Sequence, residues 1–409
     1  MTDASNWQLP IGHSHHRAAS AGGLTFVGGA GDLDATGAIR NPGNLEAQIE
    51  GAMDNLAEAL AAENCTIGDV VRLKAYYTDD KVNDWHIIAA LARRLIDDPL
   101  PAISTVPVPL QPFSGQCIQI QAIAQRGWRD FDDIRVAARP VPAAARALLG
   151  DRPLTGGLRA GEFITISNRS AADGDDAIAA PGDGIAQSHA IMEFHEKTLA
   201  ELGASLQDAV KMEGHYFGTN REQWAGLAKA RASHFHDPGP VATVVPCHRL
   251  WPEGAVTKVE VLGVRENWNG FDKYIPREDH WPKRVWDWPI NFPYRQGISA
   301  RDVIWLGGQV PSEPYSNSGK RMLEGQLLPQ TRMAMSYIED LLRPFGRRPA
   351  DLKVMICYFT SDGSQAETEA FVASLADCVG GALPPMTLVP QPMMHSPEIK
   401  VEIWGAAQG

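Results

Sequence analysis

One spacing of four residue types occurs three times along the 409-residue chain. A glutamine is followed five residues later by a methionine and twenty-one residues later by an aspartate, and an aromatic residue stands eight residues beyond the aspartate. The copies are Gln48, Met53, Asp69 and Tyr77, then Gln187, Met192, Asp208 and Tyr216, and finally Gln330, Met335, Asp351 and Phe359. Successive copies lie about 140 residues apart, which is far longer than the unit of a solenoid. Each copy is therefore predicted to be a small domain of its own.

The first copy indicates what such a domain contains. Leu45, Ile49, Met53, Leu56 and Leu60 recur every three or four residues, which predicts one amphipathic helix. The stretch VVRLKAYYT that follows alternates along its length, as a half-buried strand does. Over the whole copy the expected order is strand, helix, strand, helix, strand, strand, and the other two copies repeat it. The predicted fold class is α+β.

The repeat also sets domain boundaries. We predict domains at residues 1–130, 154–268 and 288–409, joined by linkers at 131–153 and 269–287. The first linker is rich in Ala, Arg and Pro. The second carries enough tryptophan and proline to pack as a strap over a neighbouring domain.

Composition excludes several classes of partner. Hydrophobic residues make up 44% of the chain and charged residues 21%, as in ordinary globular proteins. The net charge of −12 argues against nucleic acid or an anionic membrane as a partner. No run of 18 apolar residues and no apolar signal segment is present. The five cysteines are scattered, which favours reduced thiols in a cytoplasmic protein.

The glutamine–methionine helix and the closing strands IQIQAIA, KVEVLGV and KVEIWGA resemble the Rid (YjgF-like) family. That resemblance implies chorismate-mutase-like α+β domains, which usually assemble as homotrimers with ligand clefts between subunits. Three fused copies would form a single-chain pseudo-trimer with sheets inward, helices outward and three clefts free to diverge. The expected state is a monomeric pseudo-trimer or a low-order homo-oligomer.

The resemblance also implies candidate site residues. Family enzymes hydrolyse enamines and imines and hold the substrate carboxylate with a strand arginine, but this chain has Ile103, Ala242 and Met386 there. The closing-strand glutamate that positions water is matched by Glu260 and Glu402. Further positions expected to contact substrate, by resemblance or by their place in the copies, are Gln119, Tyr294, Ser14, Ser167, Arg169, Gln309 and Thr105.

A histidine cluster opens the chain at His13, His15 and His16. Imidazole titrates near neutrality, so His15 and His16 are candidates for proton transfer. An exposed polar leader is the alternative. No set of ligands at metal-binding spacing completes a site around them, so neither a metal nor a cofactor is expected.

Three functions remain open. The first is a hydrolase or deaminase acting on a small unsaturated nitrogen compound, such as an enamine, imine or aminomuconate-like molecule, in an inter-domain cleft. Glu260, Glu402, His15 and His16 would carry the chemistry. The second is a ring-opening cyclic amide hydrolase of the cyanuric acid hydrolase or barbiturase type, which uses repeated serine–lysine pairs. Only Ser167 stands at the matching positions, with Gly28 and Gly307 in the other copies. The third is a non-catalytic binder of small molecules.

Overall fold

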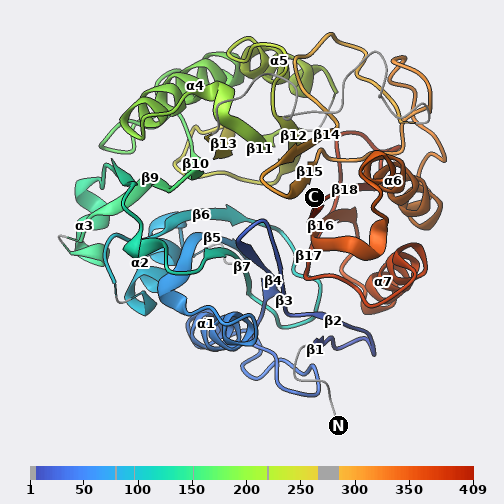
Figure 1. The fold of residues 1–409 in the computed structure, drawn as a ribbon, viewed down its shortest axis with the longest axis horizontal. Coiled ribbons are helices and arrows are strands. Elements are labelled where there is room, and N and C mark those ends of the chain that lie inside the picture. Colours follow the sequence, from blue (N-terminus) through green and yellow to red (C-terminus); the bar gives the residue numbers. More distant parts are fainter. Residues whose placement is uncertain (1–5, 79–80, 96, 151, 219–220, 266–284) are drawn as a thin grey trace.

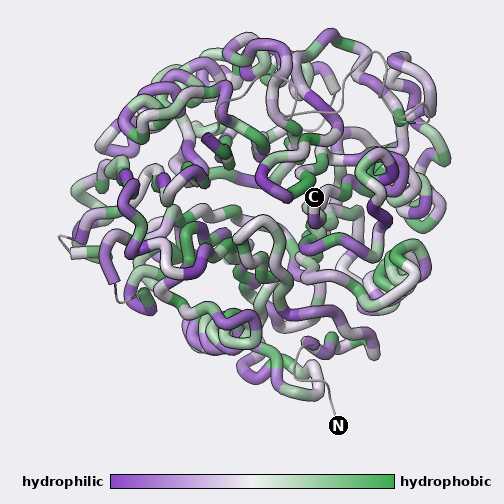
Figure 2. Tube along the Cα trace, viewed as in Figure 1, coloured by the Kyte–Doolittle hydropathy of each residue, from purple (hydrophilic) through white to green (hydrophobic). Residues whose placement is uncertain are grey.

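The structure is a computed structural model that describes residues 6–78, 81–95, 97–150, 152–218, 221–265 and 285–409. It has a mixed α+β fold in which three large sheets face the middle of the molecule and the long helices lie at its rim (Figure 1). The rim helices alternate between hydrophilic and hydrophobic residues along their length (Figure 2), as amphipathic helices packed on a sheet do.

The first sheet has the strand order β3-β4-β7-β5-β6 and is covered by two helices. Its strands are β3 (Ala18–Ala21), β4 (Leu24–Ala30), β5 (Val70–Tyr77), β6 (Ala102–Pro107) and β7 (Ile118–Gln125), and its helices are α1 (Leu45–Ala62) and α2 (Asp84–Arg94). The helix predicted from the spacing of Leu45 to Leu60 is α1, and it buries these apolar positions except Leu45, which is partly exposed.

The second sheet has the order β12-β11-β13-β10-β9-β8. Its strands are β8 (Ile134–Arg139), β9 (Leu154–Ala160), β10 (Phe163–Arg169), β11 (Ala209–Phe217), β12 (Val241–Cys247) and β13 (Thr257–Val264), and its helices are α4 (Gly184–Glu201) and α5 (Arg221–Ala232). The predicted linker 131–153 thus contains a strand, β8, which extends this sheet, and the short helix α3 (Ala143–Leu149).

The third sheet has the order β14-β15-β18-β16-β17. Its strands are β14 (Gly297–Ala300), β15 (Val303–Leu306), β16 (Leu352–Thr360), β17 (Met386–Gln391) and β18 (Val401–Gln408), and its helices are α6 (Leu327–Leu342) and α7 (Gln365–Val379). Apart from β8, all three sheets have the same order. Each also has one more strand than expected, because β3, β9 and β14 form a hairpin with the strand after them.

The repeated residues have the same structural task in each sheet. The side chains of Gln48, Gln187 and Gln330 accept a hydrogen bond from a backbone N–H just before the last strand, at Cys117, Val256 and Lys400. Asp69, Asp208 and Asp351 each cap a short 3-10 turn by accepting from the backbone N–H three residues earlier, at 2.7, 2.8 and 2.9 Å. The sequence spacing therefore marks a packing framework.

The sheets contact one another in a closed cycle. The Asn168 side chain on β10 bonds the backbone of Thr105 on β6. The Gly308 N–H, just after β15, donates to Ala242 O on β12 at 2.9 Å. Gln121 on β7 donates to Thr387 Oγ1 on β17 at 2.7 Å. At the centre the Tyr76 and Tyr358 hydroxyls are 2.8 Å apart. The three sheets thus meet pairwise at three similar interfaces.

Two further segments lie outside this plan. The N-terminal residues form a small hairpin of β1 (Asn6–Gln8) and β2 (Ser14–His16). Residues 269–284 of the predicted second linker lie outside the described residues. Its remainder leads into a described segment, 285–294, in which Trp286, Trp288, Phe292 and Tyr294 are buried. This aromatic segment packs beside the second sheet and the start of the third.

Candidate active site

A cavity of about 430 Å³ lies between the second and third sheets. Strands β11 and β12 and helix α5 form one wall, and β18 with the loop before it forms the opposite wall. The aromatic segment 285–294 closes a third side. A cavity of this size, mostly apolar with a few converging polar groups, is typical of small-molecule sites. The polar lining residues used below are Arg231, Tyr294, His395 and Glu402.

Glu402 and His395 form a buried pair in this cavity. His395 Nε2 and Glu402 Oε2 are 2.6 Å apart, and the two side chains are 11% and 6% exposed. An ionised carboxylate only accepts hydrogen bonds, so the proton of this contact belongs to Nε2. Nδ1 lies 3.3 Å from the Tyr216 hydroxyl of β11. Burial raises the pKa of Tyr216, which keeps this hydroxyl protonated and able to donate.

Gly308 makes room for the carboxylate. A Cβ at position 308 would collide with Glu402 Oε1. Glu402 lies on β18 opposite Tyr358 of β16, so its backbone is fixed by the sheet. The carboxylate is consequently held between the central strands and the cavity.

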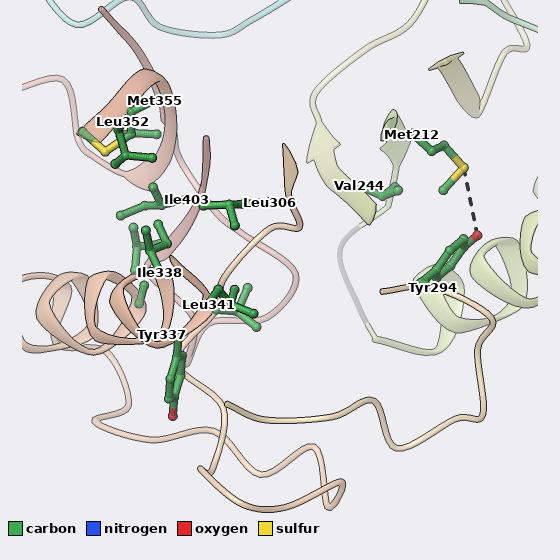
Figure 3. Close-up of a cluster of buried hydrophobic side chains, with 14 of the residues drawn as sticks. Met212, Val244, Tyr294, Leu306, Tyr337, Ile338, Leu341, Leu352, Met355 and Ile403 are labelled. Carbon is green, nitrogen blue, oxygen red and sulfur yellow. Dashed lines mark hydrogen bonds between the residues drawn. The ribbon is translucent and has the colours of Figure 1, made fainter. Parts of the chain in front are cut away.

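Several aromatic rings line the cavity. The Trp224 ring lies edge-on to Phe292 and His395, with centroids 6.2 and 6.0 Å apart. Trp286 and Trp288 meet edge to face at 5.3 Å. Figure 3 shows Tyr294 pointing at Met212 of β11, with its hydroxyl 4.0 Å from the sulfur. Such walls accept flat, unsaturated molecules.

Three cationic side chains line the cavity, Arg231, Lys320 and Arg321, and only Arg231 among them is buried. Arg231 on α5 is fully buried, and its Nη1 lies 3.4 Å from both Ser188 Oγ and Thr257 Oγ1. Burial lowers the pKa of Arg231, partly offset by the nearby Tyr294 and Tyr216 hydroxyls. These two tyrosines place the guanidinium close to the end of the chain that runs from Tyr216 through His395 to Glu402.

Strand register corrects the expected match between Glu260 and Glu402. Glu402 pairs with Tyr358, whereas the residues paired with the corresponding Tyr76 and His215 are Gln119 and Lys258. Glu260 lies two residues further along its strand, at the level of Glu213. The two Lys-Val-Glu tripeptides are thus offset by two residues in their sheets. Such an offset is hard to see in the sequence, because strand side chains alternate with a period of two and both glutamates still fall on the same face.

The other two interfaces use this position differently. Lys258 forms a buried ion pair with Asp84 of α2, and Asp84 also accepts from the Tyr77 hydroxyl at 2.9 Å. The cavities beside that pair measure about 170 and 30 Å³. At the remaining interface Gln119 donates to Gln111 and to Leu388 O at 2.9 and 2.6 Å. Both side chains are satisfied by protein groups.

Glu260 belongs to a buried charge network between the first and second sheets. Arg72 Nη2 donates to Glu260 and to Glu213 at 3.0 Å each, and Lys74 also pairs with both carboxylates. Burial alone would raise the pKa of Glu260, but Arg72 and Lys74 lower it to about 2. Ser104 supplies a further hydrogen bond at 3.0 Å. The hydrogen bonds of the Glu260 carboxylate are therefore made with protein groups.

The other predicted site residues lie apart from the cavity, except Tyr294. Ser14, His15 and His16 form β2, where the His15 ring packs on Trp7 and bonds to His16 O. Burial lowers the pKa of His15 to about 4. Ser167 donates to Gly156 O at 3.2 Å, and Gln309 donates to Gln296 and Gly307 O. Thr105 lies at the interface with Asn168. Arg169 packs over Phe194 beside Arg139 and Asp176 in a small pocket.

Three residues of the site escaped prediction: His395 and Arg231, which line the cavity, and Tyr216, which is hydrogen-bonded to His395. His395 stands seven residues before Glu402, so the two ends of one loop bring it to the carboxylate. Counting from the repeated glutamines does not fix the phase, since Gln119 and Lys258 lie 71 residues after theirs but Glu402 lies 72 and Glu260 lies 73 residues after theirs. No spacing in the sequence indicates that Tyr216 and Arg231 of one copy face Glu402 of the next.

Comparison with known proteins identifies part of the chain. Residues 8–126 match the family model Endoribonuclease L-PSP, so the chain contains a Rid/YjgF (L-PSP) family domain. Protein mmf2, mitochondrial, from Schizosaccharomyces pombe is 28% identical over 119 residues, which cover 29% of this chain and 91% of that protein.

Solved structures show similar likenesses. A chorismatase crystal structure matches with a TM-score of 0.49 and 12% identity over 83% of this chain and 93% of its own. RidA from the Antarctic bacterium Psychrobacter sp. PAMC 21119 matches with a TM-score of 0.25 and 22% identity over 31% of this chain and 98% of its own.

The described part of the chain shows neither a membrane span nor a metal centre. None of the helices in the described ranges is long and apolar enough to cross a bilayer. Within the same residues, no group of three or more His, Cys, Asp or Glu side chains is arranged to hold a metal ion.

Proposed function

We propose that this chain is a hydrolase that acts on a small unsaturated nitrogen compound, an enamine or imine, in the cavity between its second and third domains. The carrying observation is the Glu402–His395 pair, 2.6 Å apart, opening onto an aromatic cavity of about 430 Å³. The Rid/YjgF domain supports this reaction class by resemblance.

The proposal includes the architecture. Three Rid-type domains, at 1–130, 154–268 and 288–409, would form one single-chain pseudo-trimer. The shared strand order and the closed cycle of interfaces support it. The partner would be a small molecule, with no nucleic acid or membrane involved.

The residues suggest how the reaction would proceed. The Glu402–His395 pair takes a proton from a water molecule as the water oxygen adds to the carbon of the C=N bond, and the π electrons move to nitrogen, which receives that proton from the pair. The resulting carbinolamine gives its hydroxyl proton to the pair, which passes it to the nitrogen as the C–N bond breaks, so a carbonyl compound and an amine or ammonia form. For an enamine, protonation of the β-carbon first gives the imine.

Glu402→Gln and His395→Gln test this proposal. Both variants are assayed for ammonia release from a panel of enamines and imines, with Glu339→Gln on the outer face of α6 as a matched control. Loss of one general acid–base group lowers rates by about 10²- to 10⁴-fold. Unchanged turnover in both variants would exclude this pair as the acid–base group, and no ammonia release by the wild-type protein would leave a binding protein as the better description.

The other candidates receive less support from the site. Ser167, the one serine at the position expected for a cyclic amide hydrolase, donates to Gly156 O and is not among the cavity residues. The relatives described as endoribonucleases raise RNA cleavage as an alternative, and an RNA substrate in the same panel distinguishes it. The net charge of −12 disfavours RNA binding.

A further inference from the structure

We infer that Arg231 is a carboxylate-binding subsite, so that the molecule taken up by the cavity is a small, flat carboxylate. That this carboxylate is the substrate rests on the proposed function. That Arg231 binds a carboxylate does not depend on it. It starts from an unusual cation. Arg231 is fully buried and lines the cavity, yet its Nε and Nη2 have no hydrogen-bond partner among the described residues.

Other buried arginines of the chain are paired with carboxylates. Arg72 bonds to Glu213 and Glu260, Arg159 to Asp133, and Arg295 to Asp237. Arg231 has only the two long contacts of Nη1 to hydroxyl groups, at 3.4 Å each. Burying a charge without a counter-charge is costly. The cost is understandable if an anion from solution completes the site.

The unpartnered atoms have the geometry that a carboxylate needs. Nε–H and Nη2–H point to the same side of the planar guanidinium and form its side-on fork. This fork binds both oxygens of one carboxylate through two parallel hydrogen bonds. Because Nη1 is the nitrogen that contacts Ser188 and Thr257, the protein anchors one edge of the group and leaves the buried Nε and Nη2 of the other edge without a protein partner among the described residues.

The surroundings define the rest of the ligand. Tyr294 lines the same cavity as Arg231, Tyr216 lies within electrostatic range of the guanidinium, and Tyr216 is hydrogen-bonded to His395. A carboxylate on Arg231 would therefore place the body of the ligand among the aromatic rings and its far end towards Glu402. Aromatic walls favour a conjugated or ring-bearing body. In the first domain the matching helix position, 139 residues earlier, is Ala92, so the feature is particular to this cavity.

Binding of benzoate tests the subsite against benzamide, its neutral isostere, with the intrinsic fluorescence of the cavity tryptophans as readout. We expect wild type to bind benzoate about 10- to 100-fold more tightly than benzamide, as for a charge-assisted bidentate pair. Arg231→Met should lose this preference and Arg231→Lys should keep part of it. Arg159→Met, which removes a buried guanidinium away from the cavity, should keep it in full.

Thermal unfolding supplies a readout that does not depend on ligand fluorescence. In a buffer without small anions, Arg231→Met should raise the Tm because it removes an uncompensated buried charge, whereas Arg159→Met should lower it. Benzoate should raise the Tm of wild type but not of Arg231→Met.

Equal affinity of wild type for benzoate and benzamide, or a carboxylate preference that survives Arg231→Met, would overturn the inference. The proposed function fails separately. Glu402→Gln retains the benzoate preference if the subsite is correct, whether or not the wild-type protein releases ammonia from any tested imine.

Discussion

The Glu402 carboxylate occupies space that the missing side chain of Gly308 leaves open. Its Oε2 holds His395, and its Oε1 lies where a Cβ on residue 308 would be. The position of the dyad thus depends on a backbone approach as well as on a hydrogen bond. Gly29 makes the same approach to Gln119 at the interface of the first and third sheets.

Gly308→Ala should therefore damage catalysis more than folding. The added methyl pushes the Glu402 carboxylate away, and a displacement of about 1 Å can lower a rate by about 10²-fold. The stability cost should stay near 1–3 kcal/mol, as for local overpacking. Ammonia release and urea unfolding measure the two effects. The matched variant Gly29→Ala collides with Gln119 instead, and equal loss of activity in both would contradict a specific role of Glu402.

Glu260 has a structural role in the Arg72–Lys74–Glu213 network. Glu260→Gln leaves two buried cations with one carboxylate, and breaking such a pair costs about 3–5 kcal/mol. We expect the urea midpoint to fall while kcat/KM remains close to the wild-type value. The pKa of Glu260 is lowered to about 2, so its stabilisation exists above the unfolded value of about 4.3 and is lost as pH falls through about 2. Loss of activity in a folded Glu260→Gln protein would contradict this assignment.

At the scale of elements, the repeated glutamine joins a helix to the last strand of its sheet. Gln330 Nε2 donates to Met322 O, Leu323 O and Glu398 O at 2.7–3.0 Å, and Oε1 accepts from Lys400 N at 2.7 Å. In the third sheet the segment fixed in this way carries His395 and leads into Glu402. In the first sheet the corresponding segment carries Pro112, which has no titratable group.

Replacing each glutamine with leucine should separate framework from function. Each change leaves buried backbone groups without partners, at about 1–3 kcal/mol per group, so all three variants should lose stability by several kcal/mol. Only Gln330→Leu should also lower ammonia release, because it loosens the loop that holds His395. Gln48→Leu and Gln187→Leu are the controls, and a similar loss of activity in all three would indicate a global effect.

The same elements show what the sequence could predict. Helix α1 and strand β5 follow from apolar periodicity, and the threefold spacing follows from the glutamine bonds and aspartate caps that each sheet repeats. The short strands β3 and β14, four residues each, carry too few residues to show a period. Strand β8 was not predicted, because its sequence alternates only weakly between apolar and polar residues and half of the strand is exposed.

The candidate site was predictable only in part. Glu402 and Tyr294 were found by resemblance, and both lie in the cavity. Glu260 was misplaced because two identical tripeptides suggested a match that strand pairing does not support. Tyr216 lies on a strand of the second sheet and Arg231 on a helix beside it, whereas His395 lies between strands of the third sheet. Their proximity depends on which sheet edges meet, and such contacts leave no periodic trace in one sequence.

At the scale of the whole molecule, one strand position has three different surroundings. Glu402 faces a cavity, Lys258 is neutralised by Asp84, and Gln119 bonds the neighbouring sheet. In a symmetric homotrimer one substitution would change all three interfaces together. A single chain with three such interfaces can keep one for ligand and use the others for cohesion.

The stability of the folded chain is predicted to fall at acidic pH. His195 on α4 and His215 on β11 are fully or almost fully buried, as is His15 on β2. Burial lowers the pKa of His15 and His195 to about 4 and that of His215 well below the usual value. The folded protein therefore binds fewer protons than the unfolded chain between about pH 6.5 and 4, so stability is full above pH 6.5 and is lost as pH falls.

The free energy of unfolding, measured by urea titration between pH 7 and 4, should fall steeply across this window. Each histidine shifted from about 6.5 to about 4 contributes about 3 kcal/mol, and three of them acting together give a slope of up to about 4 kcal/mol per pH unit. His195→Gln keeps a donor for Val259 O, which accepts from His195 at 3.0 Å, and cannot titrate there. The slope of the unfolding free energy against pH should be smaller in this variant by the equivalent of about one proton. A wild-type stability independent of pH from 7 to 4 would refute the buried-histidine explanation.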